Sequence, residues 1–378
     1  MSTINLSKVN NWLHVVNKLP YLTSLMLYSC NLLNIFSIPL DNSSTSLDVL
    51  DLSDNNLTSS SSVLEWLFNS NTSVVELYLG YNQFQGLIPD GFSIIISLAY
   101  LSFYNNEFEG GIPKSFGGMC NLKMLTLSSN NLSGQLLGIF HNLTGCANQS
   151  IESLNFDWNQ IMGSLPNITT FPSLRILRLQ SNLLKGIMSE SLGKQSNLEI
   201  LYLSDNSLEG VISEAHFSNL TKFRLLGQFP DSCWMHLKGL EVLSLANNHF
   251  HGKIPSSVGF LRGIETLDLG NNNFSGELPS SLKNCKDLIF LNLGYNALAG
   301  QIPREIVELV GLVSLNLSRN LLTGQITSKI DMLQSLEALD LSKNQLSGGI
   351  PSSLSHIDCL SVLDLSNNNS DKPSSWYL

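Results

Sequence analysis

The chain repeats one pattern, Leu-x-x-Leu-x-Leu-x-x-Asn-x-Leu-x-Gly-x-Ile-Pro. In its most regular stretch the asparagine of this pattern recurs every 24 residues, from Asn248 to Asn368. Self-similarity with a period of roughly 20 to 50 residues is typical of a solenoid, in which each repeat packs only against its neighbours. A solenoid presents a long continuous surface and no enclosed pocket, so the repeat favours binding over catalysis.

One repeat predicts a short strand followed by an inward turn. In Leu288-x-x-Leu291-x-Leu293 the last two leucines lie two residues apart, so they face the core, while Phe290 and Asn292 face solvent. Stacked repeats then pair their strands into a parallel sheet. The asparagine three residues after the last leucine is expected to point inward, where its amide can bond backbone groups that would otherwise be buried without partners.

The Gly-x-Ile-Pro segment is expected to bend the chain into its return, because glycine permits the bend and proline discourages a strand; Gly276 and Pro279 are an example. The expected fold class is therefore an α/β solenoid. It is a curved superhelix of about fifteen ~24-residue repeats, with one parallel β-sheet on the concave face.

The inward positions form a predicted ladder along the chain, which Cys30 begins. Its asparagines are Asn55, Asn82, Asn106, Asn130, Asn159, Asn182, Asn206, Asn248, Asn272, Asn296, Asn320, Asn344 and Asn368. Their spacing predicts a partial N-terminal repeat (1–21), an irregular array (22–216), a shortened repeat (217–239), a regular array (240–369) and a non-repeat tail (370–378).

Composition and motifs exclude several functions. The net charge of −10 and pI of about 5.1 argue against nucleic acid, which requires clustered Lys and Arg. We find no phosphate-binding loop, kinase signature, metalloprotease motif or nucleophile elbow, so the chain is expected not to be an enzyme and to need no cofactor. His249 and His251 form one weak pair, from which no metal site is expected.

The six cysteines are not spaced as Cys-x-x-Cys pairs. Cys120, Cys285 and Cys359 each stand shortly before the first leucine of a repeat, and are expected to act as small buried apolar residues. Disulfides are the alternative.

Neither a secretion signal nor a membrane helix is expected, because Met1 to Leu22 has no basic start followed by an apolar run. The density of Asn-x-Ser/Thr sequons points the other way, to a secreted glycoprotein. The candidate acceptors are Asn5, Asn42, Asn56, Asn71, Asn131, Asn142, Asn148, Asn167, Asn219, Asn273 and Asn316. The sequon at Asn368 coincides with the ladder and is a poorer candidate.

Aromatic residues and arginine gather at the outward strand positions of the first half of the chain. Such residues dominate binding energy at interfaces, which makes this column a candidate ligand surface. The alternative is that tyrosine decorates exposed strands through β-propensity alone. The candidates are Tyr78, Tyr81, Tyr100, Tyr104, Trp158, Ile176, Arg178 and Tyr202.

The repeat resembles the plant-specific extracellular class of leucine-rich repeats. Longer segments resemble plant receptor-like proteins, in particular receptors for fungal ethylene-inducing xylanase. They are Leu6-Ser7-Lys8 with Trp12-Leu13, Gly227-Gln228-Phe229-Pro230-Asp231 with Cys233-Trp234, and Gly276 to Cys285.

The resemblance implies a receptor at the plasma membrane that binds a peptide or protein ligand and signals through a co-receptor kinase. The family carries a signal peptide, caps, a non-repeat island, one membrane helix and a cytoplasmic tail, none of which is found in this sequence, so membrane attachment would need a segment outside it. The alternatives are a soluble secreted inhibitor similar to polygalacturonase-inhibiting proteins, and a non-functional truncated fragment.

Overall fold

The computed structural model describes residues 4–9, 11–34, 46–69, 73–217 and 239–369. These fall into two compact units. Unit one comprises residues 1–166 and 170–183, and unit two comprises residues 167–169 and 184–378. The expected tail 370–378 and nearly all of the expected shortened repeat 217–239 lie outside the described residues.

Each unit is a solenoid of repeats, which confirms the expected fold class. The first strand of every repeat joins a parallel sheet, here called the first sheet. In unit one its strands, in order, are β1 (Ser24–Met26), β2 (Val49–Asp51), β3 (Glu76–Tyr78), β5 (Tyr100–Ser102), β7 (Met124–Thr126), β9 (Ser153–Asn155) and β11 (Ile176–Arg178). In unit two they are β13 (Ile200–Tyr202), β15 (Val242–Ser244), β17 (Thr266–Asp268), β19 (Phe290–Asn292), β21 (Ser314–Asn316), β23 (Ala338–Asp340) and β25 (Val362–Asp364).

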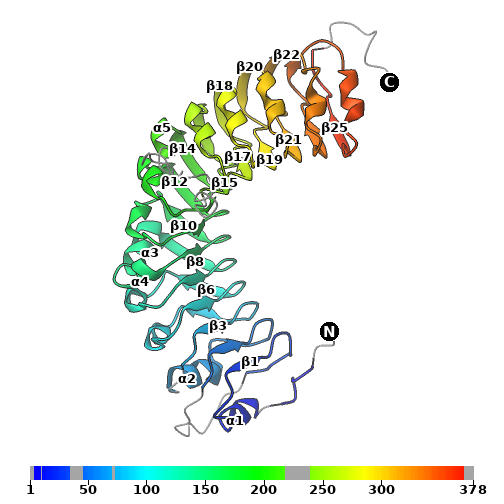
Figure 1. The fold of residues 1–378 in the computed structure, drawn as a ribbon. Coiled ribbons are helices and arrows are strands. Elements are labelled where there is room, and N and C mark those ends of the chain that lie inside the picture. The colour runs from blue at the N-terminus through cyan, green and yellow to red at the C-terminus, as the bar shows by residue number, and fades with distance from the viewer. Residues whose placement is uncertain (1–3, 10, 35–45, 70–72, 218–238, 370–378) are drawn as a thin grey trace, which may run out of the picture. The chain divides into compact units, whose positions relative to one another are not determined.

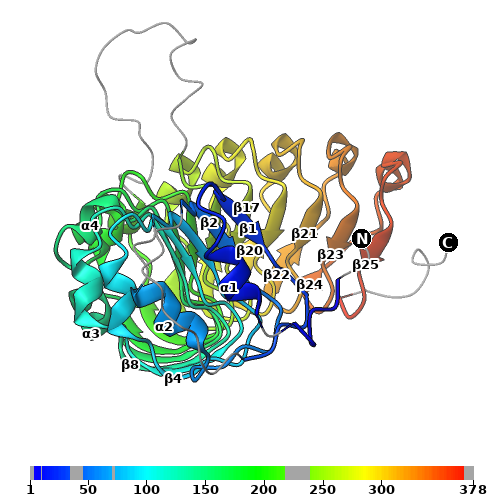
Figure 2. The same ribbon diagram turned by 90° about the horizontal axis from the view of Figure 1, so that it is seen from below.

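A second parallel sheet, which the sequence analysis did not foresee, runs beside the first in each unit (Figure 2). In unit one it contains β4 (Gln85–Leu87), β6 (Glu107–Gly110), β8 (Asn131–Gln135) and β10 (Gln160–Gly163). In unit two it contains β12 (Leu183–Ile187), β14 (Ser207–Val211), β16 (His249–Lys253), β18 (Asn273–Glu277), β20 (Ala297–Gln301), β22 (Leu321–Gly324) and β24 (Gln345–Leu346).

The glycine of Gly-x-Ile-Pro lies near the end of a strand of this second sheet, a few residues before the return begins. Gly276 belongs to β18 and has a φ of +78°, a backbone conformation that side chains disfavour. A Cβ on Gly276 would also lie 2.9 Å from the Lys253 side chain of the preceding repeat. Glycine is therefore required there by both its backbone and its close neighbour.

Short helices lie on the side of the repeats away from the first sheet (Figure 1). Unit one contains α1 (Trp12–Val16), α2 (Ser62–Asn69), η1 (Asp90–Ile94), η2 (Lys114–Gly118), α3 (Leu136–Asn142) and α4 (Ala147–Ser150), and η3 (Ile168–Thr170) includes residues of both units. Unit two contains η4 (Glu190–Lys194), α5 (Glu214–Phe217), η6 (Ser256–Phe260), η7 (Ser280–Asn284), η8 (Arg304–Glu308), η9 (Ile330–Met332) and η10 (Ser352–His356). The helix η7 begins directly after Pro279, whose φ of −68° suits a helical start.

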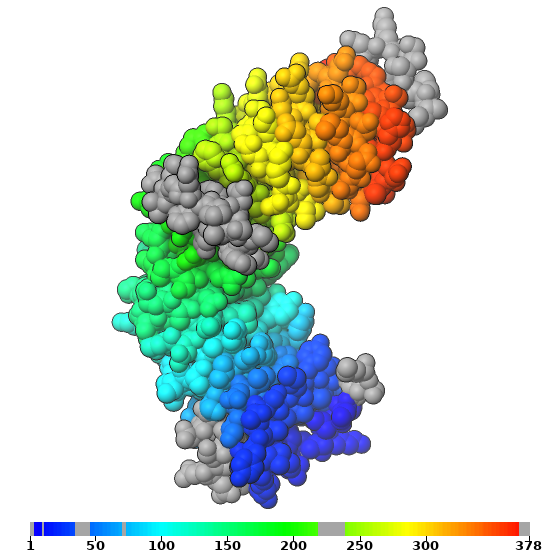
Figure 3. Space-filling model, viewed as in Figure 1, coloured from blue at the N-terminus to red at the C-terminus, as the bar shows by residue number. Residues whose placement is uncertain are grey.

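The core is a column of leucine and phenylalanine between the sheets and the helices. Leu291 and Leu293 are fully buried, as their spacing predicts. Phenylalanines stack between neighbouring repeats, with ring centroids 6.0 Å apart for Phe84 and Phe108. On the face shown in Figure 3 the repeats of each unit pack side by side.

The asparagine ladder joins each repeat to the one before it. Asn296 Nδ2 donates to the carbonyl of Leu293 at 3.2 Å and to that of Leu269, one repeat earlier, at 3.0 Å. Its Oδ1 accepts from the backbone N–H of Phe274 at 2.9 Å. Its Nδ2 also donates to the Gly294 carbonyl at 3.2 Å, so one side chain pairs four backbone groups that belong to two repeats.

Asn206 and Asn248 hold successive positions in this ladder, although they are 42 residues apart in sequence. The strands β13 and β15 pair directly, with Leu201 opposite Leu243. Asn248 Oδ1 accepts from the Leu208 N–H at 2.9 Å. The long interval is therefore not a gap in the stack of described repeats.

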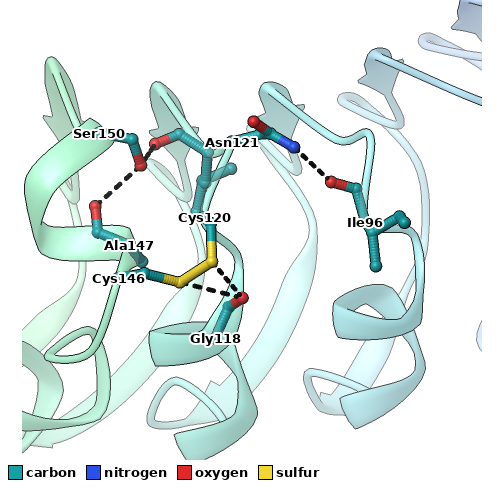
Figure 4. Close-up of a disulfide and its surroundings, with 8 residues drawn as sticks. Ile96, Gly118, Cys120, Asn121, Cys146, Ala147 and Ser150 are labelled. Carbon is teal, nitrogen blue, oxygen red and sulfur yellow. Dashed lines mark hydrogen bonds between the residues drawn. A yellow bond between two sulfur atoms is a disulfide. The ribbon is translucent and has the colours of Figure 1, made fainter.

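The expected roles of two cysteines were wrong. Cys120 forms a disulfide with Cys146, and Cys359 is exposed, while Cys285 is fully buried. Cys146 lies in the long repeat that carries α3 and α4, next to the repeat of Cys120 (Figure 4). The backbones meet closely here, since a Cβ on Gly145 would lie 2.2 Å from the carbonyl oxygen of Gly117. The sequence position of Cys120 resembles that of a core residue, and only the packing of the inserted helices provides its partner.

Replacing a buried ladder residue is expected to destabilise unit two. Asn320→Ala removes the partner of the Leu298 N–H and of the Leu293 and Leu317 carbonyls. Because buried unpaired polar groups cost about 1–3 kcal/mol, we expect a loss of about 2–3 kcal/mol in the free energy of unfolding, measured by urea denaturation. The exposed Asn284→Ala is the control. Equal stabilities for the two variants would show that the ladder bonds contribute nothing.

Removing the disulfide is expected to destabilise unit one. The cysteines are 26 residues apart, and a loop of that size predicts about 3 kcal/mol of stabilisation. Urea unfolding of Cys120→Ser/Cys146→Ser should show this loss, whereas Cys359→Ser should match the wild type. Alkylation of Cys120 and Cys146 without a reductant would contradict the bond.

Candidate ligand-binding surface

The outward face of the first sheet in unit one carries seven of the eight residues that the sequence analysis singled out. Tyr78, Tyr100, Ile176 and Arg178 lie on strands of this sheet and are half-buried. The other three, Tyr81, Tyr104 and Trp158, lie in the turns directly after β3, β5 and β9. Tyr202, the eighth, lies on β13 in unit two.

Tyr78 and Tyr100 lie on the adjacent strands β3 and β5. The pairing register places Tyr100 opposite Glu76, and the Tyr78 hydroxyl donates to Glu76 Oε2 at 2.9 Å. Burial, with the neighbouring Glu76 carboxylate, raises the pKa of Tyr78 to about 12. Tyr78 is thus neutral at ordinary pH, and its hydroxyl proton is already donated to Glu76.

Tyr81 and Tyr104 form an aromatic pair between neighbouring repeats. Their rings meet edge to face with centroids 4.9 Å apart, and their hydroxyl oxygens are 3.0 Å apart. Tyr81 is 45% exposed and has a φ of +50°. Every described residue that directly precedes a ladder asparagine shares this left-handed backbone, so the repeat geometry directs the Tyr81 side chain to the surface.

Trp158 borders a hollow of ≈ 360 Å³ on the same face. Tyr104 lies on one side of the hollow, two repeats before Trp158. Between these two aromatic residues the lining is small and polar. It consists of Ser102, Thr126, Ser128, Ser129, Asn155 and Asp157.

Asp157, which the sequence analysis missed, is the charged member of this lining. It is 4% exposed, and its Oδ1 accepts from the backbone N–H of Gln180 at 2.8 Å. Burial raises its pKa to about 6, against the opposing effects of the Gln180 hydrogen bond and the Arg178 charge. The sequence did contain a signal for Asp157. It stands two residues before the ladder asparagine Asn159, where most repeats carry Ser, Gly or Ala.

The corresponding face of unit two is polar and largely bonded to itself. Asp268, Asn292, Asn316 and Asp340 each accept from the backbone N–H two residues ahead, at 2.9 to 3.2 Å. These are local turns in which the side chain supports its own backbone. Tyr202 lies among the strands of this unit and is half-buried.

Beside this polar row, side-chain bonds link the turns of unit two. Asn247 donates to Asp205 and Asn271 donates to Asn247, both at 2.8 Å. The Arg319 guanidinium lies 4.5 Å from the centroid of the Tyr295 ring. These polar groups already have partners within the fold.

Within the described ranges, no three His, Cys, Asp or Glu side chains are grouped to hold a metal ion. No helix in the same ranges is long and apolar enough to cross a membrane.

Family comparison gives matches along most of the described chain. A model described as "Leucine rich repeat" matches residues 72–132, 172–227 and 262–322, and a second of similar description matches 46–69, 239–261 and 335–357. The chain is 44% identical over 188 residues to Receptor-like protein EIX1 of Solanum lycopersicum. That match covers 49% of this chain and 18% of the tomato protein, so the chain corresponds to a small part of that relative.

Two solved structures are also similar. The structure of PEPR1–AtPEP1 matches with a TM-score of 0.68 and 26% identity, over 94% of this chain and 52% of that one. The ectodomain of the Arabidopsis receptor kinase HAESA, in complex with an IDA peptide hormone ligand, matches with a TM-score of 0.53 and 31% identity. The HAESA match covers 86% of this chain and 58% of that one.

Proposed function

This chain belongs to the leucine-rich-repeat family, and we propose that it is a non-catalytic extracellular recognition module that binds a peptide or protein ligand on the first-sheet face of unit one. The observation that carries the proposal is a polar hollow bordered by Tyr104 and Trp158, with Tyr81 packed against Tyr104. Large aromatic side chains bury much area at low entropic cost, and so they serve as anchors for peptides and proteins.

The similarity of this chain to plant receptor proteins supports the proposal. The chain is similar to receptor-like protein EIX1 of tomato and to a HAESA ectodomain that holds a peptide hormone. We therefore propose a place at the plant cell surface, with a co-receptor kinase as signalling partner. The kinase rests on the resemblance to receptor-like proteins alone.

The disulfide supports an extracellular location. Disulfides persist in oxidising compartments and are rare in the cytosol. The Cys120–Cys146 bond therefore favours the secretory pathway, as do the sequons. Among the described acceptors, Asn142, Asn148 and Asn316 are half-buried, and the exposed ones are Asn5, Asn56, Asn131, Asn167 and Asn273.

Replacing two tyrosines of the column tests the proposed surface. A phage library of random linear peptides is panned on the wild type and on Tyr100→Ala/Tyr104→Ala. Since this change removes two anchors, we expect peptides enriched on the wild type to lose about tenfold or more in affinity, for a loss of about 1.4 kcal/mol or more. Tyr295→Ala is the control, because Tyr295 is also exposed but lies in unit two.

The panning result can fail in two ways. Equal binding to the wild type and the double variant would discard the aromatic column as the contact surface. The absence of any enriched peptide, even on the wild type, would count against peptide recognition itself. Circular dichroism of each variant shows whether it remains folded.

Glycosylation tests the proposed location. Protein purified from plant cells should lose mass on N-glycosidase treatment, with conversion to aspartate at Asn131 and Asn273. We expect lower occupancy at Asn142 and Asn148, because their Nδ2 groups donate to the carbonyls of Ile112 and Thr170 at 2.7 and 2.6 Å. Intact-mass and peptide mass spectrometry measure both. An unchanged mass would mean that the chain does not pass through the secretory pathway. Asn42, Asn71 and Asn219 lie outside the described residues.

A further inference from the structure

We propose that the hollow around Asp157 is a subsite for one cationic side chain, an arginine or a lysine, of a peptide ligand. This inference rests on the proposed function and specifies the chemistry of the same face. It depends on the shape of the hollow, on its one carboxylate and on the ion pairs of the neighbouring cations.

The hollow arises from a sequence of large, small and charged residues in consecutive repeats. At the position two residues before the ladder asparagine, three consecutive repeats carry Tyr104, Ser128 and Asp157. Neighbouring strands of a sheet are about 4.8 Å apart, so Tyr104 and Asp157 are separated by roughly 10 Å across the small Ser128. That width suits a guanidinium or ammonium group with its alkyl stem.

The lining suits a cation better than an anion or an apolar group. Asp157 is its one charged member, and the hydroxyls of Ser102, Thr126 and Ser128 can accept further hydrogen bonds. Trp158, 61% exposed, and Tyr104 offer aromatic rings, which attract cations through their π faces. Arginine in particular combines a hydrogen-bonding fork with stacking on aromatic rings.

Two of the nearby cations, Lys123 and Arg175, are paired with Glu152. Lys123 Nζ lies 3.4 Å from Glu152 Oε1, and Arg175 Nη1 lies 3.9 Å from Glu152 Oε2. For Asp157, the structure shows one hydrogen bond to Oδ1, from the backbone of Gln180, and no ion pair within the described residues. A buried carboxylate without an ionic partner is costly, and a ligand cation would offset that cost.

The charge of Asp157 makes this subsite sensitive to pH. Burial raises the Asp157 pKa to about 6, so the carboxylate is ionised above that pH and becomes neutral as the pH falls through it. Arg178, on β11, is the charged group whose field acts on Asp157, and Tyr104 faces it across the hollow. Cation binding should therefore be present at neutral pH and lost in acid. Because a bound cation favours the ionised form, the midpoint with saturating cation should lie below that of the free protein.

Three small probes test the subsite on the whole chain. The chain is labelled with fluorotryptophan, and the resonance of Trp158, one of five tryptophans, is assigned by its loss in Trp158→Phe. The fluorine signal is then followed during titration with N-acetyl-arginine amide. N-acetyl-citrulline amide, which has the same shape without the charge, is the control, and methyl glucoside tests a sugar instead.

We expect the arginine amide to shift the Trp158 resonance. The citrulline amide and the glucoside should leave it unchanged. Asp157→Asn should weaken the arginine effect about tenfold or more and abolish its dependence on pH, because a charge-assisted bond is lost. Asparagine keeps an oxygen for the Gln180 N–H, so this bond to the next repeat is preserved. The matched control is Asp268→Asn, which changes a half-buried aspartate of the first sheet in unit two, away from the hollow.

Equal shifts with arginine and citrulline, an Asp157→Asn variant that binds like the wild type, or a response to the glucoside alone would overturn the subsite. These outcomes differ from failure of the proposed function. Peptides that need Tyr100 and Tyr104, with no arginine effect at Trp158, would sustain peptide recognition and reject the subsite. An arginine effect at Trp158 without any enriched peptide would support the cation subsite and reject peptide recognition.

Discussion

The amide of the ladder asparagine is the interaction on which each unit depends. A repeat places the end of a strand and a tight turn inside an apolar core, where backbone N–H and C=O groups need partners. Asn320 supplies both kinds, since its Nδ2 donates to Leu293 and Leu317 and its Oδ1 accepts from Leu298. Because these partners belong to two repeats, the same bonds that satisfy one turn also set its register against the next.

Because inward residues hold the repeats together, the outward positions of the first sheet are free to vary. The inward leucines and the asparagines hold the stack, so an exchange such as Ser128 for Asp157 in the next repeat alters the surface without altering the core. Unit two uses this freedom for Asn and Asp residues that bond their own turns. Unit one uses it for tyrosine, tryptophan and one buried carboxylate, which are groups suited to contact a ligand.

The sequence pattern predicted the strands, the buried leucines and the candidate aromatic residues, because these follow from periods of two and 24 residues. It missed the second sheet, since strands such as Asn273–Glu277 contain Asn, Ser and Gly, which have low β-propensity. It also assigned Cys120 to the core, because the partner Cys146 approaches only through the packing of the inserted helices. Asp157 could not be singled out from the sequence alone, because Tyr104 and Gln180 also depart from the small residues usual at this position.

The sequence by itself determined that the chain is a stack of repeats, since a hydrophobic period repeated with an inward asparagine has no other way to bury its leucines and pair its turns. Only the tertiary structure decided which surface residues act together. Tyr104 and Asp157 are 53 positions apart in the chain, and they border one hollow because stacking places their repeats about two strand spacings apart. The proximity of side chains from different repeats depends on strand register and on the small residues between them, neither of which a single repeat can reveal.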